Sequence, residues 1–292
     1  MSFAESAIAW YDANARDLPW RKPDTSPWGV LVSEVMLQQT PVVRVEPAWH
    51  AWMTRWPTPA HLAAEPPAEA IRMWGRLGYP RRAMRLHACA EHLIEHHGGH
   101  VPSELDQLLA LPGIGTYTAR AVATFAFGRR HPVVDTNVRR VVSRAIEGQP
   151  DAGPATTAAD LVAVEELLPA EDRAAARASI AFMEIGALIC TARAPKCPLC
   201  PFAADCAWRL SGAPPATGPS RRPQRYAGTD RQVRGLLLEV LRHATGPVPR
   251  QRLDVVWPDE VQRARALAGL VQDGLVEPDG DVFFLAGESP VA

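Results

Sequence analysis

The stretch LPGIGTYTAR, residues 111–120, lies between two segments whose apolar residues recur with helical spacing. Glycines at 113 and 115 allow the chain to turn tightly, so that the next helix begins with unpaired backbone N–H groups. These donors and the helix macrodipole favour a bound anion such as a phosphate. The hairpin is either a phosphate-binding site or an ordinary turn between helices. If it binds phosphate, the candidate contacts are Leu111, Gly113, Gly115 and Thr116.

The remainder of the main body also has helical periodicity. Helices are expected at 29–39, 44–55, 60–64, 67–76, 80–97, 104–110 and 116–127, separated by proline and glycine signals. Strand-like alternation is scarce before the C-terminus, so the main body is predicted to be all-α. No apolar run approaches the roughly 20 residues of a membrane span, and no leader-like segment opens the chain, so an intracellular protein is expected.

The C-terminal part follows a different pattern. Residues 211–227 are predicted to be a linker, because 211–224 is rich in Pro, Gly and Ser and shows no periodicity. Helices are then expected at 230–243, near 249–255 and at 259–272, followed by two short strands around a turn at 278–281. This order predicts a winged-helix-like module at 228–292, a fold that serves DNA binding or protein contacts. Arg221, Arg222 and Arg225 of the linker region are expected to add phosphate contacts.

The charge balance restricts the chemistry. The formal net charge is −1 at pH 7, so a nucleic-acid partner would be held by local basic patches. Lys22 and Lys196 are the only lysines, and nearly all positive charge is arginine. Schiff-base catalysis needs an amine, and few side-chain amines are therefore available for it.

Two acids stand in positions that suggest a catalytic role. Glu34 lies inside the apolar helical stretch 32–40, where a carboxyl group would have its pKa raised by burial and could act as a general acid. The alternative is an exposed Glu on the polar side of that helix. Asp135 follows two valines and precedes a helix with basic residues. It is either an N-cap, a carboxylate at the mouth of a cleft, or both.

Four of the five cysteines fall in one stretch with the spacing C-x6-C-x2-C-x5-C. In a reducing compartment Cys190, Cys197, Cys200 and Cys206 indicate a metal site rather than disulfides. Four thiolates can hold zinc or an iron-sulfur cluster, and the single close pair favours iron-sulfur over the two pairs usual for zinc. Cys89 stands alone in a helical pattern and is expected to be a buried apolar residue.

The motifs, taken in order, resemble the endonuclease III superfamily of base-excision glycosylases, and within it the MutY-type adenine glycosylases. The matching segments are Leu18-Pro19-Trp20, SEVMLQQT at 33–40, 75–79, LPGIGTYTA at 111–119, VVDTNVRRV at 133–141 and EIGALICT at 184–191. The resemblance covers roughly residues 5–210. It implies an all-α helix-hairpin-helix fold, with a six-helix barrel at 24–131 beside an iron-sulfur helical domain formed by 1–23 and 132–210.

The resemblance also implies roles for individual residues. Glu34 matches the general acid and Asp135 the carboxylate that stabilises the transition state. Tyr117 and Asn137 match residues that hydrogen-bond the carboxylates, the sugar or water, and Glu184 matches an acidic active-site residue. Residues implied to contact DNA are Gln38, Gln39, Tyr79, Arg81, Arg82, Leu111, Gly113, Gly115 and Thr116, of which Gln39 and Tyr79 would wedge into the base stack. Cys190, Cys197, Cys200 and Cys206 would bind a 4Fe-4S cluster.

The implied reaction is hydrolysis of the N-glycosidic bond of adenine mispaired with 8-oxoguanine or guanine in double-stranded DNA. The resemblance also implies a cytoplasmic monomer with no membrane partner. Tyr117 stands where bifunctional relatives carry a nucleophilic lysine, so a monofunctional enzyme is expected. From its length, the chain is expected to lack the Nudix-like domain with which such enzymes recognise 8-oxoguanine. Two alternatives stay open: a glycosylase of the same fold acting on another base, such as T opposite G, and a non-catalytic, metal-clustered DNA-binding regulator.

Overall fold

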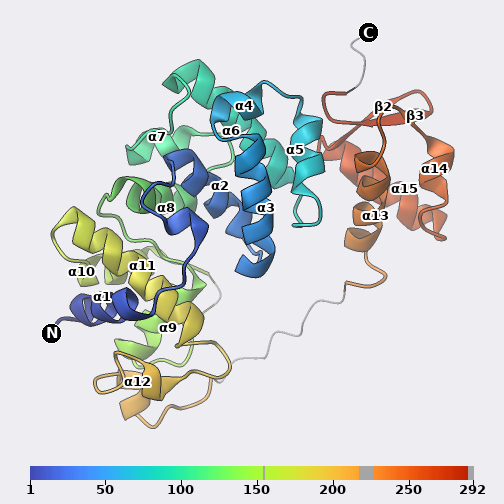
Figure 1. The fold of residues 1–292 in the computed structure, drawn as a ribbon. Coiled ribbons are helices and arrows are strands. Elements are labelled where there is room, and N and C mark those ends of the chain that lie inside the picture. The colour runs from blue at the N-terminus through green and yellow to red at the C-terminus, as the bar shows by residue number, and fades with distance from the viewer. Residues whose placement is uncertain (154, 217–225, 289–292) are drawn as a thin grey trace. The chain divides into compact units, whose positions relative to one another are not determined.

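The computed structural model describes residues 1–153, 155–216 and 226–288 (Figure 1). The described chain is mainly helical, as predicted, and its strands form one small sheet near the C-terminus. Residues 217–225 lie outside the described part, so the expectations for Arg221, Arg222 and Arg225 and for most of the linker are not addressed by it. None of the described helices is both long and apolar enough to cross a bilayer.

The main-body helices between residues 27 and 127 begin and end within two residues of the expected positions, and the sequence pattern set no bounds for the helices before or after this range. The helices of the main body are α1 (Phe3–Asn14), α2 (Pro27–Leu37), α3 (Val42–Arg55), α4 (Pro59–Ala63), α5 (Pro67–Trp74), α6 (Arg81–His97), α7 (Leu105–Ala110), α8 (Thr116–Phe127), α9 (Thr136–Ala145), α10 (Ala158–Leu167), α11 (Asp172–Leu188) and α12 (Ala207–Leu210), with short 3-10 turns at Pro19–Arg21 and Cys197–Leu199.

The chain divides into two compact units. The first comprises residues 1–31, 102–110 and 114–220, and the second comprises 32–101, 111–113 and 221–292. This division differs from the predicted domains, because α7 and α8 group with α9 to α11 and the C-terminal module groups with α3 to α6. The predicted division into a six-helix barrel, an iron-sulfur helical domain and a C-terminal module therefore stays a prediction. The two units described here are defined by the packing of the structure.

The core of the first unit forms where α1 and α9 pack against α11. Ala175, Ala178, Ala181 and Ile185 recur at helical spacing along α11 and are all fully buried. The small side chains of the three alanines let neighbouring helices approach closely. At the start of α1, Ser2 and Glu5 form a reciprocal capping box that satisfies two otherwise unpaired amides.

The core of the second unit is built around three tryptophans. Trp52, Trp56 and Trp74 are at most 1% exposed, and the ring of Trp52 meets the other two edge-to-face at centroid distances of 4.6 and 5.7 Å. This is a favoured geometry for aromatic rings. It joins α3 to α5 and so supports the segment from which the later loop 75–80 departs.

The C-terminal module has the predicted winged-helix order. It consists of α13 (Asp230–Arg242), β1 (Val248–Pro249), α14 (Arg250–Asp254), α15 (Glu260–Gln272), β2 (Val276–Asp279) and β3 (Val282–Leu285). The antiparallel sheet has the order β1-β3-β2. The two-residue strand β1 was not predicted, because two residues are too short to show an alternating pattern. Strand β2 runs to Asp279, so the turn is tighter than expected.

Candidate functional site

The predicted hairpin joins α7 to α8. Its backbone conformation requires glycine at only one of the two glycine positions. Gly113 has a φ of +75°, and a Cβ there would lie 2.7 Å from the Cβ of Arg85. Gly115 is extended, with a φ of −94°, and an added Cβ would meet nothing within 4 Å. The expectation that the turn needs both glycines is therefore right for Gly113 and wrong for Gly115.

Gly115 instead leaves the start of α8 without a side-chain cap. It is the N-cap residue and has no side chain with which to cap the first amides, and Thr116 beside it is exposed. Leu111, in contrast, is 2% exposed, so its side chain anchors the hairpin in the core. The N-terminus of a helix that lacks a side-chain cap is a common position for a bound phosphate.

Asp135 is the N-cap of α9, and both of its carboxylate oxygens are held by donors. Oδ1 accepts hydrogen bonds from the backbone N–H groups of Asn137 and Val138, each at 2.8 Å, and Oδ2 accepts one from Nδ2 of Asn137 at 2.8 Å. Burial raises the pKa of Asp135, and the three hydrogen bonds act in the opposite direction. The side chain is therefore fixed in orientation, as both predicted readings of Asp135 require.

Arg140 connects this cap to the cysteine segment, and sequence reasoning did not find it. Its guanidinium donates to Oδ1 of Asn137 at 2.7 Å, to the carbonyl of Gly186 at 2.8 Å and to the carbonyl of Cys190 at 2.5 Å. A Cβ on Gly186 would lie 2.6 Å from the carbonyl oxygen of Asn137. This glycine therefore allows α11 to approach the start of α9 closely enough for the connection.

Glu184 lies on α11 with a fully buried side chain and is bound by two arginines. Oε1 accepts from the backbone N and Nε of Arg16 at 3.1 and 2.7 Å, and Oε2 accepts from Nη2 of Arg16 and of Arg21 at 2.7 and 2.9 Å. Burial alone would raise the pKa of Glu184, but these hydrogen bonds and charges outweigh it and hold the pKa at about 2. The contacts indicate a positioning residue that ties the segment after α1 to α11.

Replacing Glu184 by glutamine is expected to lower the free energy of unfolding by about 2 kcal/mol at neutral pH, because it leaves two arginines without their buried counter-charge. The folded pKa is depressed from 4.5 to about 2, so this stabilisation is present above about pH 4.5 and is lost as the pH falls toward 2. Urea unfolding at several pH values measures it. Glu165→Gln, which removes an exposed partner of Arg130, should change stability by less than about 1 kcal/mol, and an equal loss in both variants would contradict the expectation.

The four clustered cysteines line one cavity. Its wall also includes Val141, Arg144, Ile189, Phe202 and Trp208. Arg144 donates to the carbonyl of Thr191 at 2.8 Å, and its Nη1 lies 3.6 Å from Sγ of Cys190. Burial raises the pKa of the Cys200 thiol to about 11. Within the described ranges, no three His, Cys, Asp or Glu side chains stand in an arrangement for one metal ion. Cys89 lies elsewhere and is fully buried, as expected.

Glu34 is buried within α2, so the alternative of an exposed Glu on the polar side of the helix is wrong. Its side chain is 6% exposed, and Leu31, Val32 and Met36 around it are fully buried. Glu34 belongs to the second unit, whereas Tyr117, half-buried in the first turn of α8, belongs to the first unit together with Asp135.

The two residues expected to enter the base stack both have left-handed backbones. Gln39 has a φ of 54° and Tyr79 a φ of 49°, and both are exposed, Tyr79 by 52%. Such conformations cost a non-glycine residue about 1–3 kcal/mol and persist only where neighbouring contacts enforce them. Helix α2 ends at Leu37, two residues earlier than expected, and this leaves half-buried Gln38 and exposed Gln39 in a turn.

Arg82 lies between these two loops and holds both. Its Nη1 donates to the carbonyls of Val35, Met36 and Gln38 at 2.9, 3.0 and 2.6 Å, and its Nη2 donates to the carbonyl of Gly78 at 2.9 Å. The residue is 5% exposed, and burial lowers its pKa to about 10. This geometry differs from the DNA contact inferred for Arg82 and indicates that the side chain orders the loops instead.

Arg81 has the opposite environment to that of its neighbour Arg82. Its side chain is 54% exposed and forms an ion pair with Asp273 of the C-terminal module at 3.2 Å. The guanidinium is therefore accessible from solvent, and DNA contact by Arg81 stays a prediction.

The comparisons with known proteins agree with this architecture. Residues 32–166 match the family described as HhH-GPD superfamily base excision DNA repair protein. The chain is 58% identical to an adenine DNA glycosylase of Mycolicibacterium smegmatis over 96% of this chain and 95% of that protein. For the adenine DNA glycosylase of Mycobacterium tuberculosis the identity is 55%, over 96% of this chain and 92% of that protein.

A solved structure of a thermostable thymine-DNA glycosylase aligns with a TM-score of 0.64 and 26% identity, over 72% of this chain and 95% of that one. An endonuclease III–DNA complex aligns with a TM-score of 0.60 at 23% identity, covering 72% of this chain and 94% of that one, which supports the fold alone. The near-complete match to the mycobacterial proteins is the more specific finding. The chain therefore belongs to the HhH-GPD superfamily of base excision DNA repair proteins and, within it, to the family of the adenine DNA glycosylases.

Proposed function

We propose that this protein is a monofunctional glycosylase that removes adenine mispaired with 8-oxoguanine or guanine from double-stranded DNA, acting as a cytoplasmic monomer. The observation that most directly supports this proposal is the Asp135 carboxylate at the start of α9. Both of its oxygens accept hydrogen bonds. Capping of α9 uses one carboxylate oxygen, and the second is held separately by the side chain of Asn137, which supports a further role for this acid. The mycobacterial relatives that match nearly the whole chain are themselves named adenine DNA glycosylases.

Two acids carry out different parts of the proposed reaction, Glu34 as proton donor and Asp135 as a stabilising charge. Adenine leaves poorly as an anion, so Glu34 delivers a proton to N7 while the bond from N9 to the sugar breaks and its electron pair stays with the base. The sugar becomes oxocarbenium-like, and the negative charge of Asp135 stabilises it until water adds to C1′ and gives its proton to the Glu34 carboxylate, which restores the acid. Tyr117 and Asn137 orient the sugar, the water or the carboxylates, and Asn137 already donates to Asp135.

Access to the bond requires that the adenine leaves the base stack, at a cost of a few kcal/mol. Gln39 and Tyr79 fill the gap, and their exposed side chains on strained loops support this role. The backbone donors at Gly113, Gly115 and Thr116 hold a phosphate of the DNA. Phosphate contacts of this kind add affinity without reading sequence.

The donor set of the cysteine cavity fits a 4Fe-4S cluster. Four thiols line the cavity, and Arg144 lies close enough to Cys190 to stabilise a charged sulfur. When bound, the cluster would tie down the loop 190–206, and Arg140 would transmit that order to the Asp135 cap through Asn137.

Protein purified without oxygen is expected to be brown, with a broad absorbance at about 400 nm, and to contain iron rather than zinc. Metal analysis and the absorbance spectrum measure this. Cys200→Ser should lose the colour, whereas Cys89→Ser, at a buried position outside the cavity, should keep it. Stoichiometric zinc in a colourless preparation with full activity would show that the cluster assignment is wrong.

Base removal is expected to leave an intact abasic strand until alkali or heat is applied, because no lysine stands at position 117 to form a Schiff base. Denaturing gels with and without alkali compare the two states. A lysine-free variant, Lys22→Arg with Lys196→Arg, should release base at a normal rate. Trapping of a stoichiometric adduct by borohydride during turnover would contradict a monofunctional mechanism.

The experiment that tests the proposed function is base release from a set of duplexes labelled on the adenine or thymine strand. Adenine should be released opposite 8-oxoguanine and guanine, and thymine opposite guanine should stay in place. Release of thymine alone would identify a glycosylase with another base preference. Tight binding to every duplex with no release would instead identify a regulator.

A further inference from the structure

The C-terminal module contacts the segment that carries Tyr79. Ala68 and Ile71 of α5 are fully buried in the same apolar cluster as the core of the module, and Met84 of α6 packs against it. The turn after β3 also comes close to α5, because a Cβ on Gly287 would lie 2.8 Å from Cδ of Pro67. Both helices that flank the loop 75–80 therefore lie against the module.

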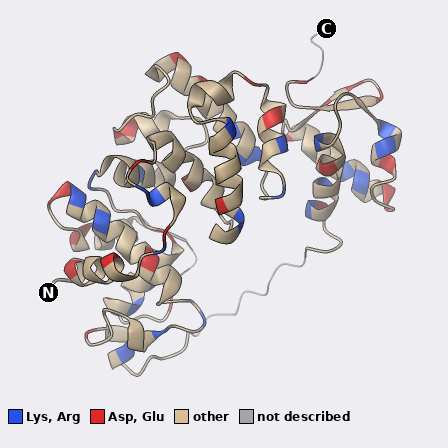
Figure 2. Cartoon of the chain, viewed as in Figure 1, with Lys and Arg blue, Asp and Glu red and all other residues tan. Residues whose placement is uncertain are grey.

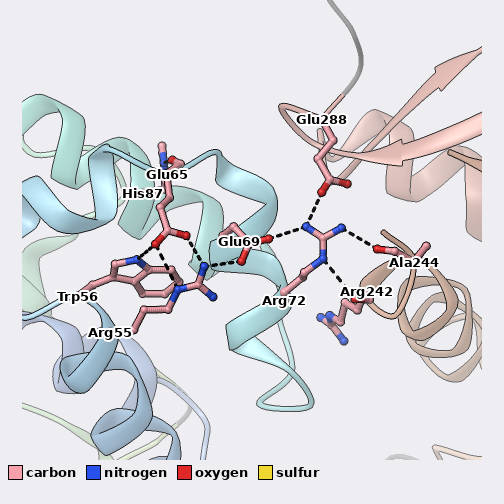
Figure 3. A network of polar contacts seen from close by, with 9 residues as sticks. All are labelled: Arg55, Trp56, Glu65, Glu69, Arg72, His87, Arg242, Ala244 and Glu288. Atoms are coloured by element: carbon pink, nitrogen blue, oxygen red, sulfur yellow. Dashed lines mark hydrogen bonds and ion pairs between the residues drawn. The ribbon is translucent and has the colours of Figure 1, made fainter. Parts of the chain in front are cut away.

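Arg72 provides the polar part of this contact (Figure 3). It donates to the carbonyls of Arg242 and Ala244 at 3.3 and 3.1 Å, forms an ion pair with Glu288, and is held from its own helix by Glu69 at 2.8 Å. Nε of Arg242 donates in return to the carbonyl of Ile71 at 3.0 Å. Reciprocal hydrogen bonds of this kind fix the end of α5 against the end of α13.

Two ion pairs lie on either side of Tyr79, one at Arg76 in the loop and one at Arg81, the first residue of α6. Arg76 makes a two-point contact with Glu239, at 3.2 and 2.8 Å, and Arg81 contacts Asp273 at 3.2 Å. The carboxylate of Asp273 is in turn held by Arg234. The backbone at Tyr79 is strained, so it needs such contacts on both sides to stay in place.

The charges of the module favour this supporting role over DNA binding. Residues 228–288 contain ten Asp and Glu, seven Arg and no Lys, and the two signs are interspersed on its elements (Figure 2). Four of the arginines, Arg234, Arg250, Arg263 and Arg265, are paired with acids of the module itself. Asp279 at the end of β2 and Asp281 in the following turn would repel phosphates.

We propose that the C-terminal module is a positioning element for excision: through Glu239 and Asp273 it holds the loop 75–80 so that Tyr79 keeps the conformation in which it enters the base stack. The inference rests on the wedge role of Tyr79 in the proposed function. A displacement of about 1 Å at a substrate-positioning group can lower a rate by about 100-fold. Disturbing the module should therefore reduce excision without removing any group that touches DNA.

The test uses the full chain and measures single-turnover adenine release opposite 8-oxoguanine, together with the fluorescence of a 2-aminopurine placed beside the mismatch to report unstacking. Glu239→Lys, which sets like charges against each other at Arg76, should lower the rate about tenfold and weaken the unstacking signal. Adding Arg76→Glu restores the pair with opposite polarity and should recover both. Asp273→Asn, a milder change on the other side of the loop, should lower the rate by a smaller factor.

Asp281→Lys is the matched control, because it makes the same charge change in a residue that pairs with Arg250 inside the module and should leave the rate unchanged. In a Tyr79→Ala background, Glu239→Lys should cause no further loss. A loss of the same factor in both backgrounds, or full rates in both Glu239→Lys and Asp273→Asn, would overturn the proposal. If the unaltered chain releases no adenine, the proposed function fails first, and that outcome is seen before any variant is compared.

Discussion

Replacement of Glu34 by glutamine is expected to lower the single-turnover rate of adenine release by about 100-fold to 10,000-fold while DNA affinity stays within about threefold. Glutamine keeps the size of the side chain and a hydrogen-bonding amide but has no proton to deliver to N7. The 6% exposure of Glu34 means that bulk water has little access with which to substitute for it. Rapid-quench kinetics and binding to a mismatch duplex give the two quantities.

Two features make this substitution informative. Glu95→Gln makes the same chemical change on the exposed face of α6, where the side chain is 69% exposed, and should leave both rate and affinity unchanged. A thermal melt should show that Glu34→Gln is folded, since the amide is isosteric with the carboxyl group. A Glu34→Gln protein that is folded and turns over near the normal rate would remove Glu34 from the mechanism.

Asp135→Asn is expected to cause a loss of similar size, about 100-fold to 10,000-fold in the rate of base release. Asparagine caps a helix about as well as aspartate, so α9 should keep its start and DNA affinity should persist. What the variant loses is the negative charge that stabilises the oxocarbenium-like sugar. The rate at saturating enzyme separates this loss from any change in binding.

The pH dependence of the rate gives an independent readout for Asp135. Burial raises the pKa of this carboxyl group, so the unaltered protein should lose activity as the pH falls through that raised value and the charge disappears. Asp135→Asn should lack this acid limb, because its side chain does not titrate. Asp259→Asn, the same change at the N-cap of α15, should keep both the limb and the rate. An acid limb that persists unchanged in Asp135→Asn would assign it to another group.

Much of this architecture was evident from local sequence features. The helical periodicity and the proline and glycine signals located helices α2 to α8 to within two residues, and the order of elements in the C-terminal module was predicted except for β1. These features are readable because capping and amphipathic spacing involve residues within a few positions of each other. The cysteine spacing and the acids Glu34 and Asp135 were found in the same way.

The tertiary structure decided what depends on partners distant in the chain. Glu184 binds Arg16 and Arg21, more than 160 positions earlier, and its active-site role, implied by the resemblance, stays a prediction. Arg82 looked like a DNA contact, yet it is buried between two loops that no local pattern brings together.

The contact of the C-terminal module with α5 and the strained backbone at Tyr79 also arise only in the folded chain. A sequence shows which residue types are available and how they repeat. Which arginine meets which carboxylate is set by packing, because burial makes each unpaired charge costly and so selects the partner.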